Sequence, residues 1–214
     1  MRNLSDFIKR FFIVTIFVTC AVLFLVGSIT PPSRVIVFIT SLSRSTINAE
    51  IATDKKWYIK QYAEKLNRNE YTIETIYKYS TQFNIPFNFA LAIGYQESGL
   101  IHYNPNRPLN KNINGSFDYG IFQLNSKTYP NVIDNYGTIE KNTKQGISHL
   151  ALEYKRYNSF EISAMTYNCG NAKKVGVQTL DYLRNVLKYE KDLDEFVNSI
   201  YKHKISRDFS SGKI

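Results

Sequence analysis

One carboxylate in this sequence lies where a helix could present it for proton transfer. Four residues share one face of a predicted helix because they are spaced i, i+3, i+4 and i+7: Ala90, Ile93, Gly94 and Glu97. Gly99 follows, and glycine often ends a helix in the left-handed conformation. An acid at the end of an apolar face is poorly solvated, so we expect the pKa of Glu97 to rise towards that of a general acid. The alternative interpretation is a glutamate that faces water at a frayed helix end.

The composition limits the possible partners without choosing one. The chain has 214 residues and a formal net charge of +9, which is enough sequence for one moderate domain with appendages. The charge suits an acidic partner such as nucleic acid, anionic lipid or an anionic cell-wall polymer. Lysine and arginine are spread along the chain, so no basic block selects one of these classes. The 16 tyrosines and 14 phenylalanines suit a packed core or a sugar-binding cleft equally well.

The cysteines and histidines predict neither a disulfide nor a metal site. Cys20 lies inside an apolar N-terminal segment, far along the chain from Cys169, so we expect the two not to pair. The histidines are scattered without metal-ligand spacing, and we expect each of them to be structural: His102, His149 and His203. The sequence therefore predicts no metal and no cofactor.

The N-terminus predicts a transmembrane or signal helix. Arg2, Lys9 and Arg10 precede an uncharged apolar run that covers residues 11–27 and extends to residue 29. At about 1.5 Å per residue the shorter run spans roughly 25 Å, slightly less than a bilayer core of about 30 Å. The basic flank predicts that this end stays in the cytoplasm and that the remainder crosses the membrane. A cleaved secretory signal has the same order of basic and apolar residues and is the alternative.

Beyond a polar linker, the apolar spacing predicts a mainly α-helical domain with a small β-hairpin. Helical patterns cover residues 57–66, 71–83, 86–98, 140–157, 162–169, 182–187 and 193–200. In one of them a core stripe is expected at Ile162, Met165, Thr166 and Cys169, which makes Cys169 a small core residue. Asn114-Gly115 is a strong signal for a two-residue hairpin, since both residues tolerate positive φ.

Four short motifs follow one another in a meaningful order. They are Gln96-Glu97-Ser98, Gly120-Ile121-Phe122-Gln123, Thr166-Tyr167-Asn168-Cys169-Gly170 and Tyr182-Leu183-Arg184-Asn185-Val186. Together they resemble the lytic transglycosylase domain of the soluble-lytic-transglycosylase (SLT) type, whose motifs read E-S, G-L-M-Q, A-Y-N-A-G and Y-x-x-x-V. The resemblance covers roughly residues 86–189. The departures are Ile121-Phe122 for Leu-Met, and Thr166 and Cys169 for Ala; none removes a polar group expected to touch substrate.

This resemblance implies a lysozyme-like α+β fold and a lyase that cleaves the MurNAc–GlcNAc β-1,4 bond of peptidoglycan. Glu97 matches the family's catalytic acid, which protonates the glycosidic oxygen and then, as a base, accepts the proton of the MurNAc C6 hydroxyl. That hydroxyl closes onto C1 and leaves a 1,6-anhydro end. The resemblance also assigns substrate-binding or acid-orienting roles to Ser98, Gln123, Tyr167, Asn168 and Tyr182. Helix capping by Asn168 and core packing of Tyr182 are the alternatives for those two.

Asp118 supports a second enzymatic hypothesis. Residues 114–126 also look like the active-site ribbon of animal-type lysozymes, in which an Asp precedes Tyr-Gly, and Asp118 falls at that position. A retaining glycosidase needs its acid and its nucleophile about 5 Å apart. If Glu97 and Asp118 meet that demand, the protein is a muramidase that leaves reducing MurNAc ends. The motifs at Tyr167 and Tyr182 favour the transglycosylase, and Asp118 then has a structural role in the ribbon.

These interpretations divide the chain into four segments. Residues 1–45 form the membrane anchor or signal with its linker, 46–85 the leading helices, 86–190 the lysozyme-like domain and 191–214 a C-terminal helix and tail. We expect the domain to lie outside the cytoplasm, anchored in the inner (cytoplasmic) membrane or secreted, which argues against nucleic acid as a partner. The expected partners are peptidoglycan glycan strands, the membrane and an envelope-spanning machine. A non-catalytic peptidoglycan-binding scaffold is the alternative from another class.

Overall fold

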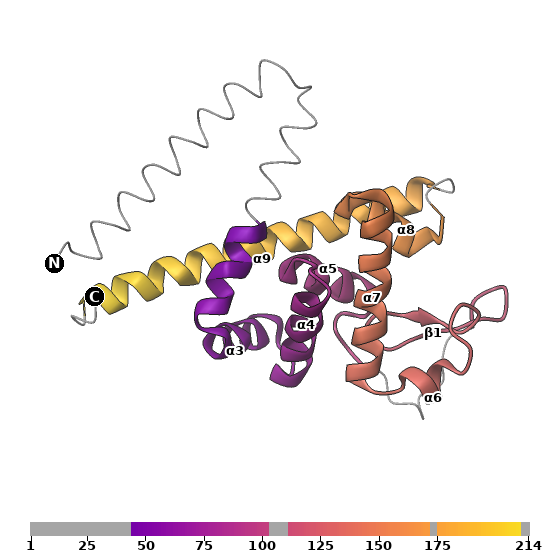
Figure 1. Ribbon diagram of the computed structural model, residues 1–214, viewed down its shortest axis with the longest axis horizontal. Helices are drawn as coiled ribbons and strands as arrows, with labels where there is room; N and C mark the ends of the chain where they lie inside the picture. Colours follow the sequence, from indigo (N-terminus) through magenta and orange to yellow (C-terminus); the bar gives the residue numbers. More distant parts are fainter. Residues whose placement is uncertain (1–43, 103–110, 172–174, 211–214) are drawn as a thin grey trace, which may run out of the picture. The chain divides into compact units, whose positions relative to one another are not determined.

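The computed structural model describes residues 44–102, 111–171 and 175–210 (Figure 1). The predicted membrane segment at residues 11–29 lies outside this part of the chain. Among the described residues, no helix is both long enough and apolar enough to cross a membrane. The chain divides into two compact units, Met1–Thr46 and Ile47–Ile214, and the second contains every helix and strand labelled in Figure 1.

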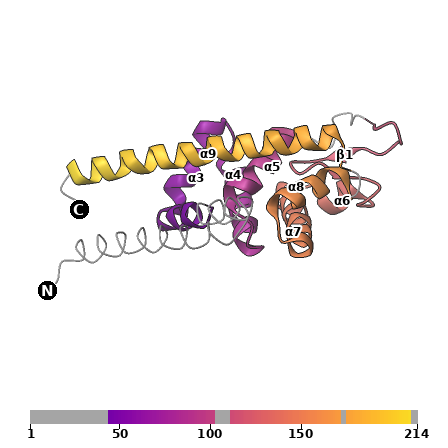
Figure 2. The same cartoon turned by 90° about the horizontal axis from the view of Figure 1, so that it is seen from above.

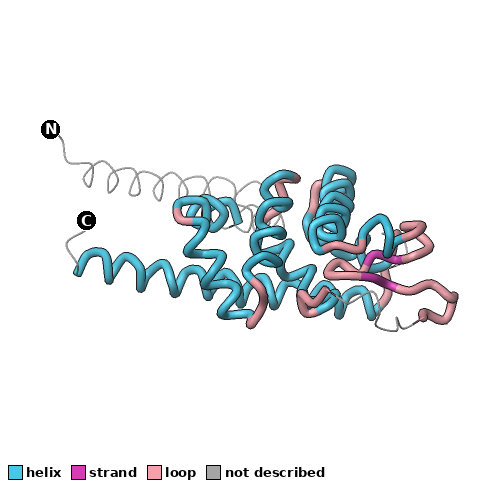
Figure 3. The backbone as a smooth tube through the Cα atoms, turned by 90° about the horizontal axis from the view of Figure 1, so that it is seen from below, coloured by secondary structure: helices cyan, strands magenta, loops and turns pink. Residues whose placement is uncertain are grey.

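The second unit is mainly helical, as the sequence predicts. After a helical segment at residues 47–53 come helices α3 (Lys55–Leu66), α4 (Glu70–Gln82) and α5 (Phe87–Ser98), followed by strands β1 (Asp118–Tyr119) and β2 (Leu124–Asn125). The C-terminal part contains α6 (Val132–Tyr136), α7 (Ile139–Tyr157), α8 (Phe160–Cys169) and α9 (Val177–Ser210). Among the described residues, β1 and β2 form a single two-stranded antiparallel sheet (Figure 3). This composition fits the lysozyme-like α+β class.

Helix α5 is the centre of the core. Every residue from Phe87 to Gly94 is buried, so this part of the helix is enclosed on all sides, whereas its sequence predicts one apolar face. It packs against α4 and α9, and α9 runs along the unit to reach α8 as well (Figure 2). Gly94 permits a close approach, because a Cβ there would lie 2.9 Å from Leu100 Cδ2 and 3.3 Å from Ile121 Cγ2. The helix ends at Gly99 with φ +63°, as predicted.

The last helix corrects one prediction. The apolar pattern predicts separate helices over residues 182–187 and 193–200, but α9 is continuous from Val177 to Ser210. No proline or glycine interrupts this stretch, and Val186, Leu193 and Val197 are all buried at helical spacing. Nothing therefore ends the helix between the two segments, and position 190, the expected end of the domain, lies inside α9.

The core face of α8 also differs from the predicted stripe. The buried residues are Ser163, Ala164 and Thr166, whereas Ile162 and Cys169 are only partly buried. Because α8 packs against both α7 and α9, small side chains occupy the close contacts and the larger apolar ones lie at the margin. Cys169 is therefore not a core residue.

The Asn114-Gly115 turn exists but does not join the two strands. The Gly115 N–H donates to the Asn112 carbonyl at 2.8 Å, and Gly115 has φ +79°. This turn closes only an isolated bridge between Lys111 and Phe117. Asn114 is absent from the residues with positive φ, so the predicted two-residue hairpin geometry is wrong here.

The hairpin turn lies instead in the Gly120–Gln123 motif. In the sheet, Asp118 pairs with Asn125 and Tyr119 pairs with Leu124. Gly120 and Gln123 adopt positive φ angles of +77° and +44°, and the Gln123 side-chain amide donates to the Gly120 carbonyl at 2.7 Å. The motif thus closes its own turn by a local side-chain contact, which the spacing of apolar residues does not reveal.

Candidate active site

A polar groove of about 730 Å³ gathers most of the predicted site residues. Its walls come from the end of α5, the β1–β2 ribbon, the loop after β2, and helices α7 and α8. The residues that line it and could bind a ligand by polar contacts are Glu97, Asn114, Asp118, Gln123, Asn125, Lys127, Thr128, Tyr129, His149, Tyr167 and Asn168. A second hollow of about 570 Å³ lies between α3, α5 and α9 and contains none of the predicted site residues. The first groove is therefore the candidate active site.

Glu97 lies in the wall of this groove at the end of α5. Its Oε1 accepts a hydrogen bond of 2.6 Å from the hydroxyl of Tyr182, which α9 supplies from 85 positions further along the sequence. Burial raises the pKa of Glu97 to about 7; the Tyr182 hydrogen bond opposes this shift, and the charge of Asp118 adds to it. A carboxyl group with a pKa near neutrality can both give and accept a proton, as the sequence predicts for Glu97.

Asp118 faces the same groove but is held by two amides. Its Oδ2 accepts from the Asn112 side chain at 2.9 Å, and its Oδ1 accepts from the Asn125 side chain at 2.8 Å. Each carboxylate oxygen therefore already has a hydrogen-bond partner from the ribbon itself. Asp118 is within electrostatic reach of Glu97, because its charge contributes to the raised pKa of that acid.

The remaining predicted residues differ in what they contact. Gln123, Tyr167 and Asn168 line the groove. The Tyr167 hydroxyl donates to the Phe122 carbonyl at 2.7 Å, so this side chain also supports the ribbon turn. The Ser98 hydroxyl donates to the Ile121 carbonyl at 2.8 Å, which ties the end of α5 to the same turn. Ser98 thus orients the helix end, and its contact with substrate stays a prediction.

Asn142 is a site-supporting residue that the sequence analysis missed. This fully buried side chain on α7 donates to the Tyr119 carbonyl and accepts from the Phe122 N–H, both at 2.9 Å. Gly120 packs directly on it, since a Cβ at Gly120 would overlap the Asn142 amide. One side chain therefore satisfies two main-chain groups of the ribbon turn that the interior would otherwise leave unpaired.

The sequence model of the transglycosylase SLT domain matches residues 74–186, which is more than half of the chain. The chain belongs to the transglycosylase SLT domain family. The matched range runs from α4 into α9 and includes Glu97, the ribbon and Tyr182, which confirms the resemblance found in the sequence. No curated protein matches the chain. Membership in this family makes the domain a transglycosylase-type enzyme domain that acts on peptidoglycan.

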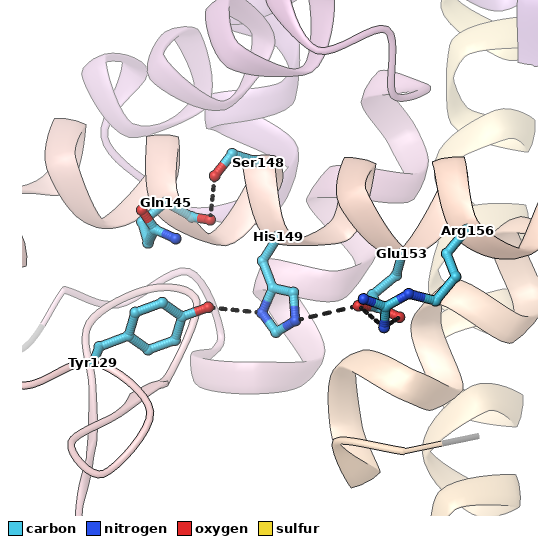
Figure 4. Close-up of polar contacts among 6 residues, drawn as sticks. All are labelled: Tyr129, Gln145, Ser148, His149, Glu153 and Arg156. Atoms are coloured by element: carbon cyan, nitrogen blue, oxygen red, sulfur yellow. Dashed lines mark hydrogen bonds and ion pairs between the residues drawn. The ribbon is translucent and has the colours of Figure 1, made fainter. Parts of the chain in front are cut away.

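The groove of this SLT domain also contains residues that the sequence did not predict for it. His149 on α7, which was expected to be structural, lines the groove together with Tyr129 from the loop after β2 (Figure 4). Cys169 also lies in the groove wall. A signal for His149 exists in the sequence, because Asn142, Gly146, His149 and Glu153 are spaced i, i+4, i+7 and i+11 on one face of α7. These four residues form a stripe of polar side chains with one glycine along α7. This stripe indicates the face of the helix that lies towards the ribbon.

No group of three or more His, Cys, Asp or Glu side chains that could hold a metal ion occurs within residues 44–102, 111–171 and 175–210. The polar atoms of the groove are instead those of amides, hydroxyls, one imidazole, one ammonium group and two carboxylates. Such a lining is suited to a neutral, hydroxyl-rich ligand, since it offers both donors and acceptors along the groove wall.

Replacing Tyr182 by phenylalanine should raise the pKa of Glu97 further above its value of about 7. The Tyr182 hydroxyl donates to the carboxylate and so favours the charged form, and its removal leaves burial and Asp118 unopposed. A ¹³C NMR titration of the glutamate side-chain carboxyl groups would measure the shift. Tyr189→Phe is the matched control on α9, because Tyr189 contacts Tyr95 and is not a partner of Glu97. An unchanged or lower pKa of Glu97 in Tyr182→Phe would contradict the role assigned to this hydrogen bond.

Proposed function

We propose that this SLT domain is a lytic transglycosylase that cleaves the MurNAc–GlcNAc β-1,4 bond and leaves a 1,6-anhydro-MurNAc end. The observation that supports this is Glu97, a groove carboxyl group whose pKa is raised to about 7. In its protonated form it donates to the glycosidic oxygen as the bond to C1 breaks. The resulting carboxylate accepts the proton of the C6 hydroxyl while that oxygen forms a bond to C1. Glu97 ends the cycle protonated again, and no water is consumed.

The proposed reaction requires one group that acts first as an acid and then as a base within a single turnover. A carboxyl group with its ordinary pKa of 4.5 would be ionised at neutral pH and unable to start as an acid. Burial removes that obstacle, while Tyr182 keeps the carboxylate form accessible for the second step. Gln123, Tyr167 and Asn168 are proposed to hold the sugar rings, since all three line the groove beside Glu97.

A muramidase that uses Asp118 as nucleophile is the second candidate. It is favoured by the position of Asp118 in the same groove and by its electrostatic effect on Glu97. The hydrogen bonds from Asn112 and Asn125 count against it, because they hold both carboxylate oxygens within the ribbon. We therefore propose that Asp118 shapes the ribbon and helps to keep Glu97 protonated.

The products released from purified sacculi distinguish the two enzymes. Mass spectrometry should find 1,6-anhydro-muropeptides with the unaltered protein, and exclusively reducing MurNAc ends would establish the muramidase instead. Asp118→Asn should keep the anhydro product and most of the activity, because the carboxylate takes no covalent part. Asn112→Ala is the matched control, since it removes one donor to Asp118 but neither the carboxylate nor a residue of the groove wall. Loss of activity in Asp118→Asn alone, with Asn112→Ala active, would contradict the transglycosylase mechanism.

We also propose that the domain works outside the cytoplasm, where peptidoglycan lies. The basic flank and apolar run at residues 2–29 support either an inner-membrane anchor or a cleaved signal. Mass spectrometry of the mature N-terminus would decide between these two forms. An envelope-spanning machine that needs a local opening in the wall is the partner proposed for an anchored enzyme. A non-catalytic scaffold would bind sacculi and release no product.

A further inference from the structure

Four polar side chains follow one another from the wall of the groove into α7 (Figure 4). The Tyr129 hydroxyl lies 2.8 Å from Nδ1 of His149, and Nε2 of the same ring lies 3.9 Å from Oε1 of Glu153. Arg156 donates to both Glu153 oxygens at 2.9 and 3.2 Å. Only Tyr129 and His149 of the four line the groove. These contacts therefore connect the Glu153–Arg156 ion pair on α7 to the Tyr129 hydroxyl, which a bound ligand can reach.

The charges around His149 determine which of its nitrogens carries the proton. The Glu153 side chain is only 4% exposed, so its charge acts on Nε2 with little screening by water. At 3.9 Å the contact is too long for a hydrogen bond, but it favours an N–H that points towards the carboxylate. Burial lowers the pKa of His149 below its ordinary value; Glu153 opposes this and Arg156 adds to it. Burial thus favours the neutral imidazole, and the Glu153 charge favours the tautomer that carries its proton on Nε2.

The tautomer of His149 determines the direction of the Tyr129 hydrogen bond. An unprotonated Nδ1 can only accept, so the Tyr129 hydroxyl must donate to it. The side-chain amide of Gln145 opposes the rise in the Tyr129 pKa that burial causes, so this donor favours the phenolic oxygen as an acceptor. With its single proton committed to His149, Tyr129 can offer a ligand in the groove an acceptor and not a donor. The Tyr167 ring packs on His149 with 5.2 Å between ring centroids and limits how the imidazole can turn.

We propose that Tyr129 binds the glycan strand by accepting a hydrogen bond from a sugar hydroxyl or acetamido N–H, with His149 and Glu153 as positioning residues. This inference rests on the proposed function, because it assumes that the groove binds glycan. Sugars carry donors of this kind on every ring, and an acceptor of fixed direction selects among the possible orientations of the strand. Glu153 acts through His149 and does not itself reach the groove.

Binding of glycan strands freed of their stem peptides tests the proposal without relying on turnover. All variants are made in the Glu97→Gln background, so that the strand is not cleaved, and affinity is measured by calorimetry. Tyr129→Phe should weaken binding about 10-fold, the expected effect of one lost hydrogen bond. Tyr136→Phe is the matched control, since Tyr136 packs edge-on against Tyr129 at 5.6 Å but is not part of the groove wall.

The positioning roles are tested by combining substitutions. Glu153→Gln should weaken binding when Tyr129 is present and have no further effect in Tyr129→Phe, because both changes remove the same contact. His149→Phe, which keeps a ring beside Tyr167, should behave in the same way and serves if Glu153→Gln does not fold. A ¹⁵N NMR spectrum should show the Nε2–H tautomer of His149 at neutral pH and a mixture of tautomers in Glu153→Gln.

Three experimental results would contradict the proposals, and each of them contradicts a different part. Equal affinity of Tyr129→Phe and its parent would overturn the inference while leaving the proposed function intact. Additive losses in the double variants, or an Nδ1–H tautomer in the parent, would overturn the positioning roles of His149 and Glu153. Failure of the Glu97→Gln parent to bind any glycan strand would overturn the groove as the substrate site, and with it both proposals.

Discussion

Replacement of Glu97 by glutamine should lower the release of anhydro-muropeptides by about 10²- to 10⁴-fold, the range associated with loss of a general acid–base group. Glutamine has the shape of a glutamic acid and can still accept the hydrogen bond from Tyr182. It has no acidic proton for the glycosidic oxygen and cannot take one from the C6 hydroxyl. The rate is measured by liquid chromatography and mass spectrometry of muropeptides released from purified sacculi.

The fold of this variant should be intact, and its stability has a predicted dependence on pH. The pKa of Glu97 is about 7 in the folded protein against an ordinary value of 4.5, so the unfolded chain releases this proton at lower pH. The contribution of Glu97 to the stability of the fold is therefore fully present below pH 4.5, and it is lost as the pH rises to about 7. Glutamine does not ionise, so Glu97→Gln does not lose stability in this pH range. Above pH 7 the variant should therefore be more stable than the unaltered protein by at most about 3 kcal/mol.

A matched control separates the catalytic effect from a general effect of charge. Glu64 on α3 is exposed and lies outside the groove, so Glu64→Gln should keep the full rate. If Glu97→Gln released product at the rate of the unaltered protein, the acid would have to be another residue and the proposed mechanism would be wrong.

Replacement of Asn142 by leucine should lower the free energy of unfolding by about 2–5 kcal/mol, because two buried main-chain groups lose their partner. These groups are the Tyr119 carbonyl and the Phe122 N–H, which no longer meet an amide at that position. Leucine also fills the place against which Gly120 packs. Urea unfolding followed by circular dichroism would measure the change.

Two further substitutions show whether the lost hydrogen bonds cause this effect. Asn142→Asp can still accept from the Phe122 N–H but cannot donate to the Tyr119 carbonyl as a carboxylate, so its stability should lie between those of Asn142→Leu and the unaltered protein. Lys141→Leu introduces the same side chain at the neighbouring, exposed position and should be nearly neutral. Unchanged stability in Asn142→Leu would show that the ribbon turn does not depend on α7.

Local signals in the sequence predict most of the helices correctly. The end of α5 at Gly99 and the end of α8 at Gly170 follow from a residue that adopts positive φ without strain, +63° and +71° here. The prediction is wrong in two places, α9 and the hairpin turn. Two apolar clusters suggest two helices, but they lie on one uninterrupted helix, α9, because no breaker separates them. Asn114-Gly115 suggests the hairpin, but the Gly120–Gln123 turn has more tertiary support.

The sequence by itself predicted the family and the mainly helical class correctly, and it singled out Glu97 as the candidate acid. These depend on short motifs and helical spacing, which are properties of neighbouring residues. The tertiary structure alone brought Tyr182 to Glu97 across 85 positions of sequence, placed Asn142 behind the ribbon turn and set His149 opposite Tyr129. The physical reason is that burial and hydrogen-bond partners depend on which distant elements pack together, and no local period in the chain encodes that packing.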